Sequence, residues 1–257
     1  MNHFAQGLKR CIRSFAHSQS TGLRIPTEIT DIGTNQRFPK DDAIEVQSRP
    51  QARPLLASEI EYYGALLGRG FAEEGCFMAQ LQPLDDERVR QKYLEVCCTG
   101  FVRGMLEHGA ICQVVPQRGI ILSADCSQTF LDVEAIWEVA GEAADAAIPE
   151  HWRQLIQERY TAMEQLLVLD WPTQLPQGFL HLAALAIDSA WRGRGTFGAL
   201  VDPLCAEADA RRLPIALEAF KDELVPVYGS RGFEVIERRH NTELDLTLNL
   251  MVRQPHQ

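Results

Sequence analysis

The sequence predicts a single α/β (α+β) domain over residues 42–257, preceded by a basic extension over residues 1–41. The chain has 257 residues, of which 46% are hydrophobic and 23% charged, so it can bury a core without disulfides or a metal. Strand-like and helix-like apolar patterns alternate over its last third, as is typical of mixed α/β domains. Residues 1–41 are instead rich in Ser, Thr, Gln and Arg, which indicates an extension outside the folded core.

The start of the extension has the spacing of one short amphipathic helix. Its apolar residues fall on one face and its basic residues elsewhere: Phe4, Leu8, Ile12 and Phe15, with Lys9, Arg10 and Arg13. No acidic residue precedes Glu28. Two interpretations stay open, namely a signal for an organelle or for secretion, and a solvated tail on a cytoplasmic protein.

The first part of the domain shows the patterns of a short strand, two helices, a β-hairpin and a longer helix. In chain order these cover residues 43–46, 58–67, 85–107, 110–124 and 152–167. Ser58 is the expected N-cap of the first helix, because its hydroxyl can accept a free N–H of the first turn. Pro149 stands near the start of the last helix, and Pro172 marks its end.

The last third of the chain predicts strands and helices in close succession. The apolar run over residues 179–187, interrupted only by His181, predicts a strand that is buried on both faces. Strict alternation of leucines over residues 244–252 predicts a strand with one core face. Between them we expect a helix, a strand, a short helix and a strand, over residues 196–211, 214–219, 224–230 and 233–237.

Composition argues against several classes of protein. The formal net charge is -10, so the chain would repel the phosphate backbone, and we expect no nucleic-acid partner. No apolar run approaches the about 20 residues that a transmembrane helix needs. The seven cysteines are odd in number and form no C-x-x-C, which favours reduced thiols in the cytoplasm over structural zinc. There is no H-E-x-x-H motif and no G-x-S-x-G elbow, so we expect neither a metal site nor a serine hydrolase.

A basic, glycine-rich turn follows the strand over residues 179–187. It reads Trp191-Arg192-Gly193-Arg194-Gly195 and leads directly into a helix. Glycine lets the backbone approach an anion closely, and the first N–H groups of a helix are free to bind it. The turn therefore predicts a phosphate cradle, although ordinary surface loops can share this composition.

Three motifs in this region, in the right order, resemble the GNAT superfamily of acyl-CoA-dependent N-acyltransferases. Leu182–Asp188 followed by Arg192–Gly195 resembles its strand and R/Q-x-x-G-x-G/A turn, Leu213–Ala219 its next strand, and Val227–Val235 its Y-x-x-x-G-F ending. The segment Asp202–Asp209 is similar to that of puromycin-type antibiotic acetyltransferases. The resemblance implies a mixed, mostly antiparallel central sheet, flanked by helices and splayed at its centre, where the pantetheine arm of the cofactor inserts.

The resemblance also implies acetyl-CoA as acyl donor, with no metal. Its expected contacts are Leu185, Ala186, Ile187, Arg192, Gly193, Arg194, Gly195, Thr196, Phe197 and Gly198. One N–H of the strand would bind the oxyanion of the reaction. The chain departs from the family at Phe197, where Gly or Ala is usual, and at Leu224, where many members have Asn. The side chain of Phe197 must therefore point away from the diphosphate.

Two residues, Tyr228 and His181, match catalytic positions of the family, and Glu218 is a further candidate from its place at the end of the next strand. Tyr228 corresponds to the tyrosine that protonates the departing sulfur, with a core aromatic residue as the alternative reading. His181, eleven residues before Arg192, is the first candidate for the base that deprotonates the amine, and Glu218 is the second. A hydrogen-bonded core histidine is an equally good reading of His181.

These observations predict acetyl transfer to a primary amine of a small molecule. Two alternatives remain, namely an acyl-CoA-binding regulatory module with little turnover and a protein-directed acetyltransferase. We expect acceptor recognition to come from residues 58–140, where no diagnostic cluster identifies the amine. The oligomeric state, a homodimer included, stays open.

Overall fold

The computed structural model describes residues 50–256, except 130, 132–135, 137–139, 142, 145 and 168–170. The expected extension over residues 1–41, with its short helix, and the expected strand over residues 43–46 lie outside the described residues. The domain boundary at residue 42 therefore stays a prediction.

One seven-stranded sheet forms the centre of the molecule, in the order β1-β2-β3-β4-β5-β7-β6. Its strands are β1 (Arg53–Pro54), β2 (Ile111–Val115), β3 (Gly119–Asp125), β4 (Leu180–Ile187), β5 (Ile215–Ala219), β6 (Phe233–Asn241) and β7 (Leu246–Arg253). All neighbouring strands are antiparallel except β4 and β5, which are parallel. The predicted mixed, mostly antiparallel sheet is thus confirmed.

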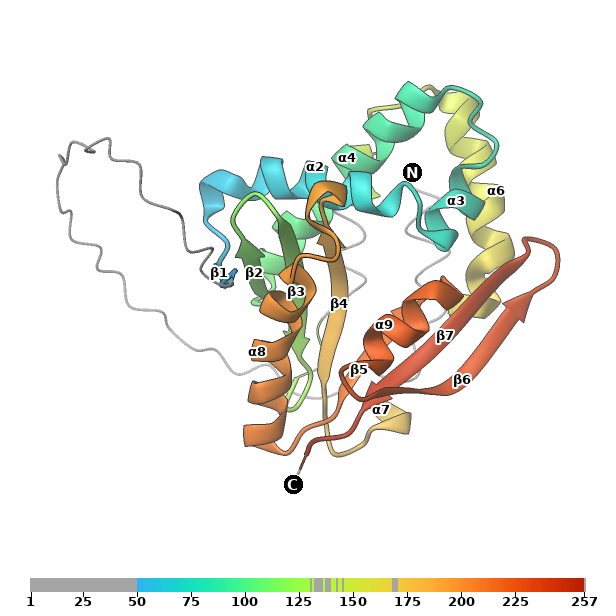
Figure 1. The fold of residues 1–257 in the computed structure, drawn as a ribbon. Coiled ribbons are helices and arrows are strands. Elements are labelled where there is room, and N and C mark those ends of the chain that lie inside the picture. Colours follow the sequence, from blue (N-terminus) through green and yellow to red (C-terminus); the bar gives the residue numbers. More distant parts are fainter. Residues whose placement is uncertain are drawn as a thin grey trace, which may run out of the picture.

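The sheet opens between its two parallel strands. β4 and β5 pair only at Leu180 with Ile215 and at His181 with Ala216, and beyond these pairs the strands diverge (Figure 1). On the other side of β4, Ala183 is skipped in the pairing with β3, because Ser123 pairs with Leu182 and Leu122 with the residue after Ala183. This β-bulge bends β4 just where the opening begins. The splay expected at the centre of the sheet is present.

Helices cover both faces of the sheet (Figure 1). They are α2 (Ile60–Phe71), α3 (Gly75–Leu81), α4 (Glu87–Glu107), α6 (Glu150–Leu167), α7 (Trp171–Gln174), α8 (Thr196–Arg211) and α9 (Val225–Gly229), with short 3-10 turns η1 (Ala57–Glu59), η2 (Ser189–Trp191) and η3 (Asp222–Leu224). One face packs against α2 and α4 at β2–β4 and against α3, α6 and α7 at β5–β7. The opposite face packs against α8 and α9.

The start of α2 differs from the expectation. Ser58 lies inside η1 and is not the N-cap, which is Glu59 and makes no capping hydrogen bond with its side chain. The carboxylate of Glu59 instead accepts hydrogen bonds from Arg53 at 2.6 Å and from the N–H of Leu56. These bonds, and not a serine hydroxyl, fix the segment that leads into α2. The helix α3, for which we had no sequence signal, lies between α2 and α4 and carries a residue of the site described below.

Candidate active site

The loop between β4 and α8 presents a row of free backbone amides. Gly193 and Gly195 have φ of 71° and 81°, a left-handed conformation that favours glycine. Within α8 the first amide to bond is that of Ala199, which donates to the carbonyl of Gly195 at 3.1 Å. The amides of residues 193–198 donate to no group among the described residues. Such a run at a helix N-terminus is suited to an anion, as the predicted phosphate cradle requires.

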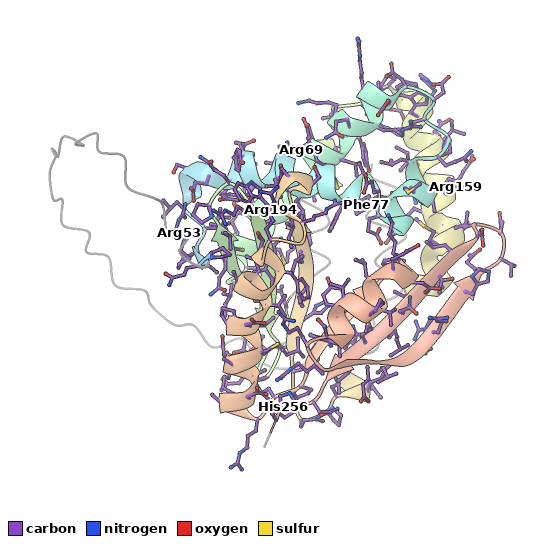
Figure 2. All side chains as sticks on the ribbon, in the orientation of Figure 1. Arg53, Arg69, Phe77, Arg159, Arg194 and His256 are labelled. Atoms are coloured by element: carbon purple, nitrogen blue, oxygen red, sulfur yellow. The ribbon has the colours of Figure 1, made fainter. Side chains whose placement is uncertain are left out.

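Arginines flank this loop (Figure 2 labels Arg194). The guanidinium carbons of Arg118 and Arg194 lie 4.0 and 5.6 Å from the centre of the Trp191 ring. Arg192 lies 3.4 Å from Glu73, an exposed pair that is worth little. Three arginines thus lie in or beside this loop on a chain whose net charge is -10.

Tyr228 is a buried phenol whose hydroxyl has no hydrogen-bond partner in the part of the chain that the structure describes. Its ring packs edge-on against Phe197 and Phe233, with both centroid distances 5.7 Å. The residue is 7% exposed, and its hydroxyl makes no hydrogen bond to another described residue. Burial, followed by the negative charge of Glu74, raises the pKa of Tyr228 well above its usual range. The phenol therefore stays protonated at neutral pH and can act as a proton donor.

Phe197 and Leu224, the two departures from the family pattern, both pack into the core under α8 and α9. The ring of Phe197 is turned toward Tyr228 on α9, as expected for a side chain that must point away from the open face of the loop. No described residue lies within 4 Å of the position that a Cβ on Gly193 would take.

His181 and Glu218 meet in a buried ion pair across the point where β4 and β5 separate. Nε2 of His181 lies 2.8 Å from Oε2 of Glu218, with side chains 14% and 13% exposed. The indole N–H of Trp171 donates to the other oxygen of Glu218. Burial lowers the pKa of His181, but the charge and hydrogen bond of Glu218 outweigh it and raise the pKa above its usual value.

Burial likewise raises the pKa of Glu218, and the charge of His181, with hydrogen bonds from His181 and Trp171, outweighs it and lowers the pKa. The raised pKa of His181 and the lowered pKa of Glu218 both favour an imidazolium paired with a carboxylate. The structure thus brings the two predicted bases together but does not bring them to Tyr228. The charge felt by the phenol comes from Glu74.

Glu74 is a candidate base that the sequence analysis missed. It caps α3, where its Oε2 accepts the N–H of Cys76 at 2.8 Å and of Phe77 at 3.4 Å. Its Oε1 bonds to no described residue. The side chain is partly exposed, yet the surrounding protein buries the carboxyl group enough to raise its pKa to about 7, against the opposing effect of the two hydrogen bonds and of Lys221.

The start of α3 lies against the end of β5, because a Cβ on Gly75 would be 2.6 Å from the carbonyl oxygen of Phe220. This contact brings Glu74 toward the open end of the split strands and within electrostatic range of Tyr228. The only sequence signal for Glu74 is an acidic pair between two phenylalanines, Phe71 and Phe77, whose rings stack at 5.2 Å.

Within the part of the chain that the structure describes, no group of three or more His, Cys, Asp or Glu could hold a metal ion. The cysteines resolved there are free thiols, and all but Cys76 are buried. None of the described helices is both long and apolar enough to cross a membrane.

No protein-family model and no curated protein matches the sequence. Solved structures do match. An acetyltransferase from Corynebacterium glutamicum, described as histone acetyltransferase HPA2 and related, aligns with a TM-score of 0.54 and 16% identity over 82% of this chain and 98% of its own. The chain has the GNAT acetyltransferase fold. Arylalkylamine N-acetyltransferase 2 from Aedes aegypti aligns with a TM-score of 0.50 and 16% identity, over 80% of this chain and 99% of its own.

An N-acetyltransferase from Staphylococcus aureus Mu50 aligns to the same degree, with a TM-score of 0.50 and 16% identity over 79% of this chain and 99% of its own. At this identity the likeness shows the GNAT fold, and activity has to be argued from the site. A closer likeness to puromycin-type enzymes stays a prediction, as do the roles of the individual site residues.

Proposed function

We propose that the protein is an acetyl-CoA-dependent N-acetyltransferase that acetylates a primary amine of a small molecule. The observation that carries the proposal is the buried hydroxyl of Tyr228, which has no hydrogen-bond partner among the described residues. Its side chain shares a core with the split strands and with α8, the helix whose N-terminal amides are free. A buried polar group without a partner is costly, and a ligand that binds it removes the cost.

Acetyl-CoA fits the groups that surround this hydroxyl. The diphosphate would occupy the amides of residues 193–198, with Arg192 and Arg194 nearby. β4 has lost its β5 neighbour beyond His181, so the backbone of Leu185, Ala186 and Ile187 has one edge for the amide groups of the pantetheine arm. The thioester would then lie within the split, toward Tyr228.

The proposed reaction begins with removal of a proton from the ammonium form of the substrate. A primary alkylamine has a pKa of about 10.4, so it needs a base at neutral pH. Glu74 suits this task, because its pKa of about 7 is near the working pH and one of its oxygens is free. His181 stays the alternative base, although its Nε2 is already bound to Glu218.

The neutral amine then attacks the thioester carbonyl, and a C–N bond forms as the carbonyl becomes an oxyanion. A free N–H of β4 beyond the bulge would stabilise that oxyanion. When the C–S bond breaks, Tyr228 gives its proton to the thiolate and regains one from the amine nitrogen through water. The products are an N-substituted acetamide, free CoA and the proton held by Glu74.

The acceptor class is proposed from chemistry and from one structural neighbour. The Aedes aegypti protein is named an arylalkylamine N-acetyltransferase. In this chain Phe71 and Phe77, whose rings stack, flank Glu74 in the sequence, and the backbone N–H of Phe77 donates to its carboxylate; apolar side chains so close in the chain would suit an amine with an apolar body. A small alkylamine or arylalkylamine is therefore the acceptor to test first.

Thiol release from acetyl-CoA with a panel of such amines tests the proposal, with CoA binding measured in parallel by calorimetry. We expect release that depends on both the amine and the enzyme. Tight CoA binding with no release for any amine would contradict the proposal and favour a regulatory acyl-CoA-binding module.

A further inference from the structure

We propose that Arg231 binds the 3′-phosphate of the cofactor, beside the N-terminus of α8. The inference rests on the proposed function, because it assigns one contact of acetyl-CoA. Arg231 occupies an unspecified position of the Y-x-x-x-G-F ending, so the motif assigns it no role, and it lies beyond the loop expected to hold the diphosphate.

The guanidinium of Arg231 is fixed against the first turn of α8. Its Nε donates to Oδ1 of Asp202 at 2.6 Å, and its Nη1 donates to the hydroxyl of Ser230 at 3.1 Å. Its Nη2 donates to no described residue and lies 2.8 Å from the position that a Cβ on Gly198 would take. Two of the three nitrogens thus orient the group, and the third remains available beside the helix N-terminus.

The ring of Phe197 also helps to orient the guanidinium of Arg231. The guanidinium carbon of Arg231 lies 5.5 Å from the centre of the Phe197 ring, in range for a cation–π interaction. The same ring packs on Tyr228, and the N–H of Arg231 donates to the carbonyl of Tyr228 at 2.8 Å. The aromatic residue at a position where the family has Gly or Ala therefore holds a cation beside the cofactor loop.

Position and chemistry together select the ligand. The free amides of residues 193–198 can hold the diphosphate, whereas Arg231 adjoins Gly198 at the far end of that run. CoA carries one further phosphate, the 3′-phosphate of the ribose, and we assign it to Arg231. Arginine binds phosphate with charge-assisted hydrogen bonds, which are stronger than neutral ones.

Calorimetric titration of the full chain with CoA and with 3′-dephospho-CoA tests the assignment. We expect the wild-type protein to bind CoA about tenfold more tightly, as one partly exposed charge-assisted contact provides. In Arg231→Gln, CoA should bind about tenfold more weakly and 3′-dephospho-CoA equally well. Arg212→Gln removes the same charge at the other end of α8 and should change neither affinity.

Two results would overturn the assignment. Equal weakening of both ligands by Arg231→Gln would place the contact at the diphosphate or show a loss of packing. Loss of the preference in Arg118→Gln, with the preference kept in Arg231→Gln, would move the 3′-phosphate to the arginine stacked on Trp191.

Asp202→Asn should change CoA affinity in the opposite direction to Arg231→Gln. The asparagine oxygen can still accept the Nε of Arg231, but the negative charge beside the phosphate is gone. CoA should bind about threefold more tightly, with little change for 3′-dephospho-CoA. Weaker CoA binding in this variant would contradict the proposal. Because these are binding measurements, a chain that shows the pattern but acetylates no amine would refute the proposed function alone.

Discussion

At the residue scale, the proposed reaction uses two acidic groups whose pKa values are raised, the phenol of Tyr228 and the carboxyl group of Glu74. Burial holds the phenol of Tyr228 in its protonated form and raises the pKa of Glu74 to about 7. A proton donor and a proton acceptor can therefore coexist at neutral pH. In the proposed reaction one proton moves from the amine to this carboxylate, and the phenol supplies another to the sulfur as the C–S bond breaks.

Tyr228→Phe removes the donor while keeping the ring that packs on Phe197. We expect the turnover number to fall by about a hundredfold, since general acid catalysis contributes on that order, and CoA affinity to change by less than about twofold. Stopped-flow thiol release and calorimetry measure the two quantities. Tyr62→Phe is the matched control, because Tyr62 is 47% exposed. Equal turnover in Tyr228→Phe would remove the proposed role.

Glu74→Gln tests the base. Glu74 acts only when deprotonated, so kcat/KM of the wild-type protein should fall as the pH drops below about 7. The variant should lose this limb of the profile and about a hundredfold of its rate. Glu73→Gln, at the exposed neighbouring acid, should keep the limb. A pH profile that Glu74→Gln leaves unchanged would return the role of base to His181.

At the element scale, local sequence signals predicted most of the helices and strands around the site. α8 spans the residues expected for it, and β4 and β5 start within a residue of expectation, because glycine, proline and apolar periodicity mark their ends. α3 was missed because its seven residues are too short for a clear period, and Glu74 was missed with it. The contact between Phe197 and Tyr228 joins two helices, so no local pattern could reveal it.

The close approach of α2 and α4 gives a stability prediction for these elements. A Cβ on Gly64 would lie 2.3 Å from Oγ1 and 2.5 Å from Cα of Thr99, so the helices must move apart in Gly64→Ala. We expect the free energy of unfolding to fall by at least about 2 kcal/mol. Gly229→Ala, in α9 with no described residue within 4 Å of the new Cβ, should change it by less than about 1 kcal/mol. Urea unfolding measures both, and equal effects would contradict the packing account.

At the scale of the whole molecule, charge is distributed unevenly. The chain has 35 acidic and 25 basic residues, yet arginines gather around the amide loop. An acidic body attracts a cationic amine, while the positive loop receives the phosphates of CoA. The two substrates of the proposed reaction would thus respond to charges of opposite sign.

This distribution predicts how salt affects the reaction. The attraction between an ammonium and the acidic body is screened beyond a Debye length of about 8 Å at physiological ionic strength. With acetyl-CoA saturating, kcat/KM for an alkylamine should therefore fall about two- to fivefold between about 0.02 and 0.2 M salt. An amine that is neutral at the assay pH, such as an arylamine, should show no such fall. If both amines lose rate equally, the salt effect belongs to acetyl-CoA, and steering of the amine by the acidic body is refuted.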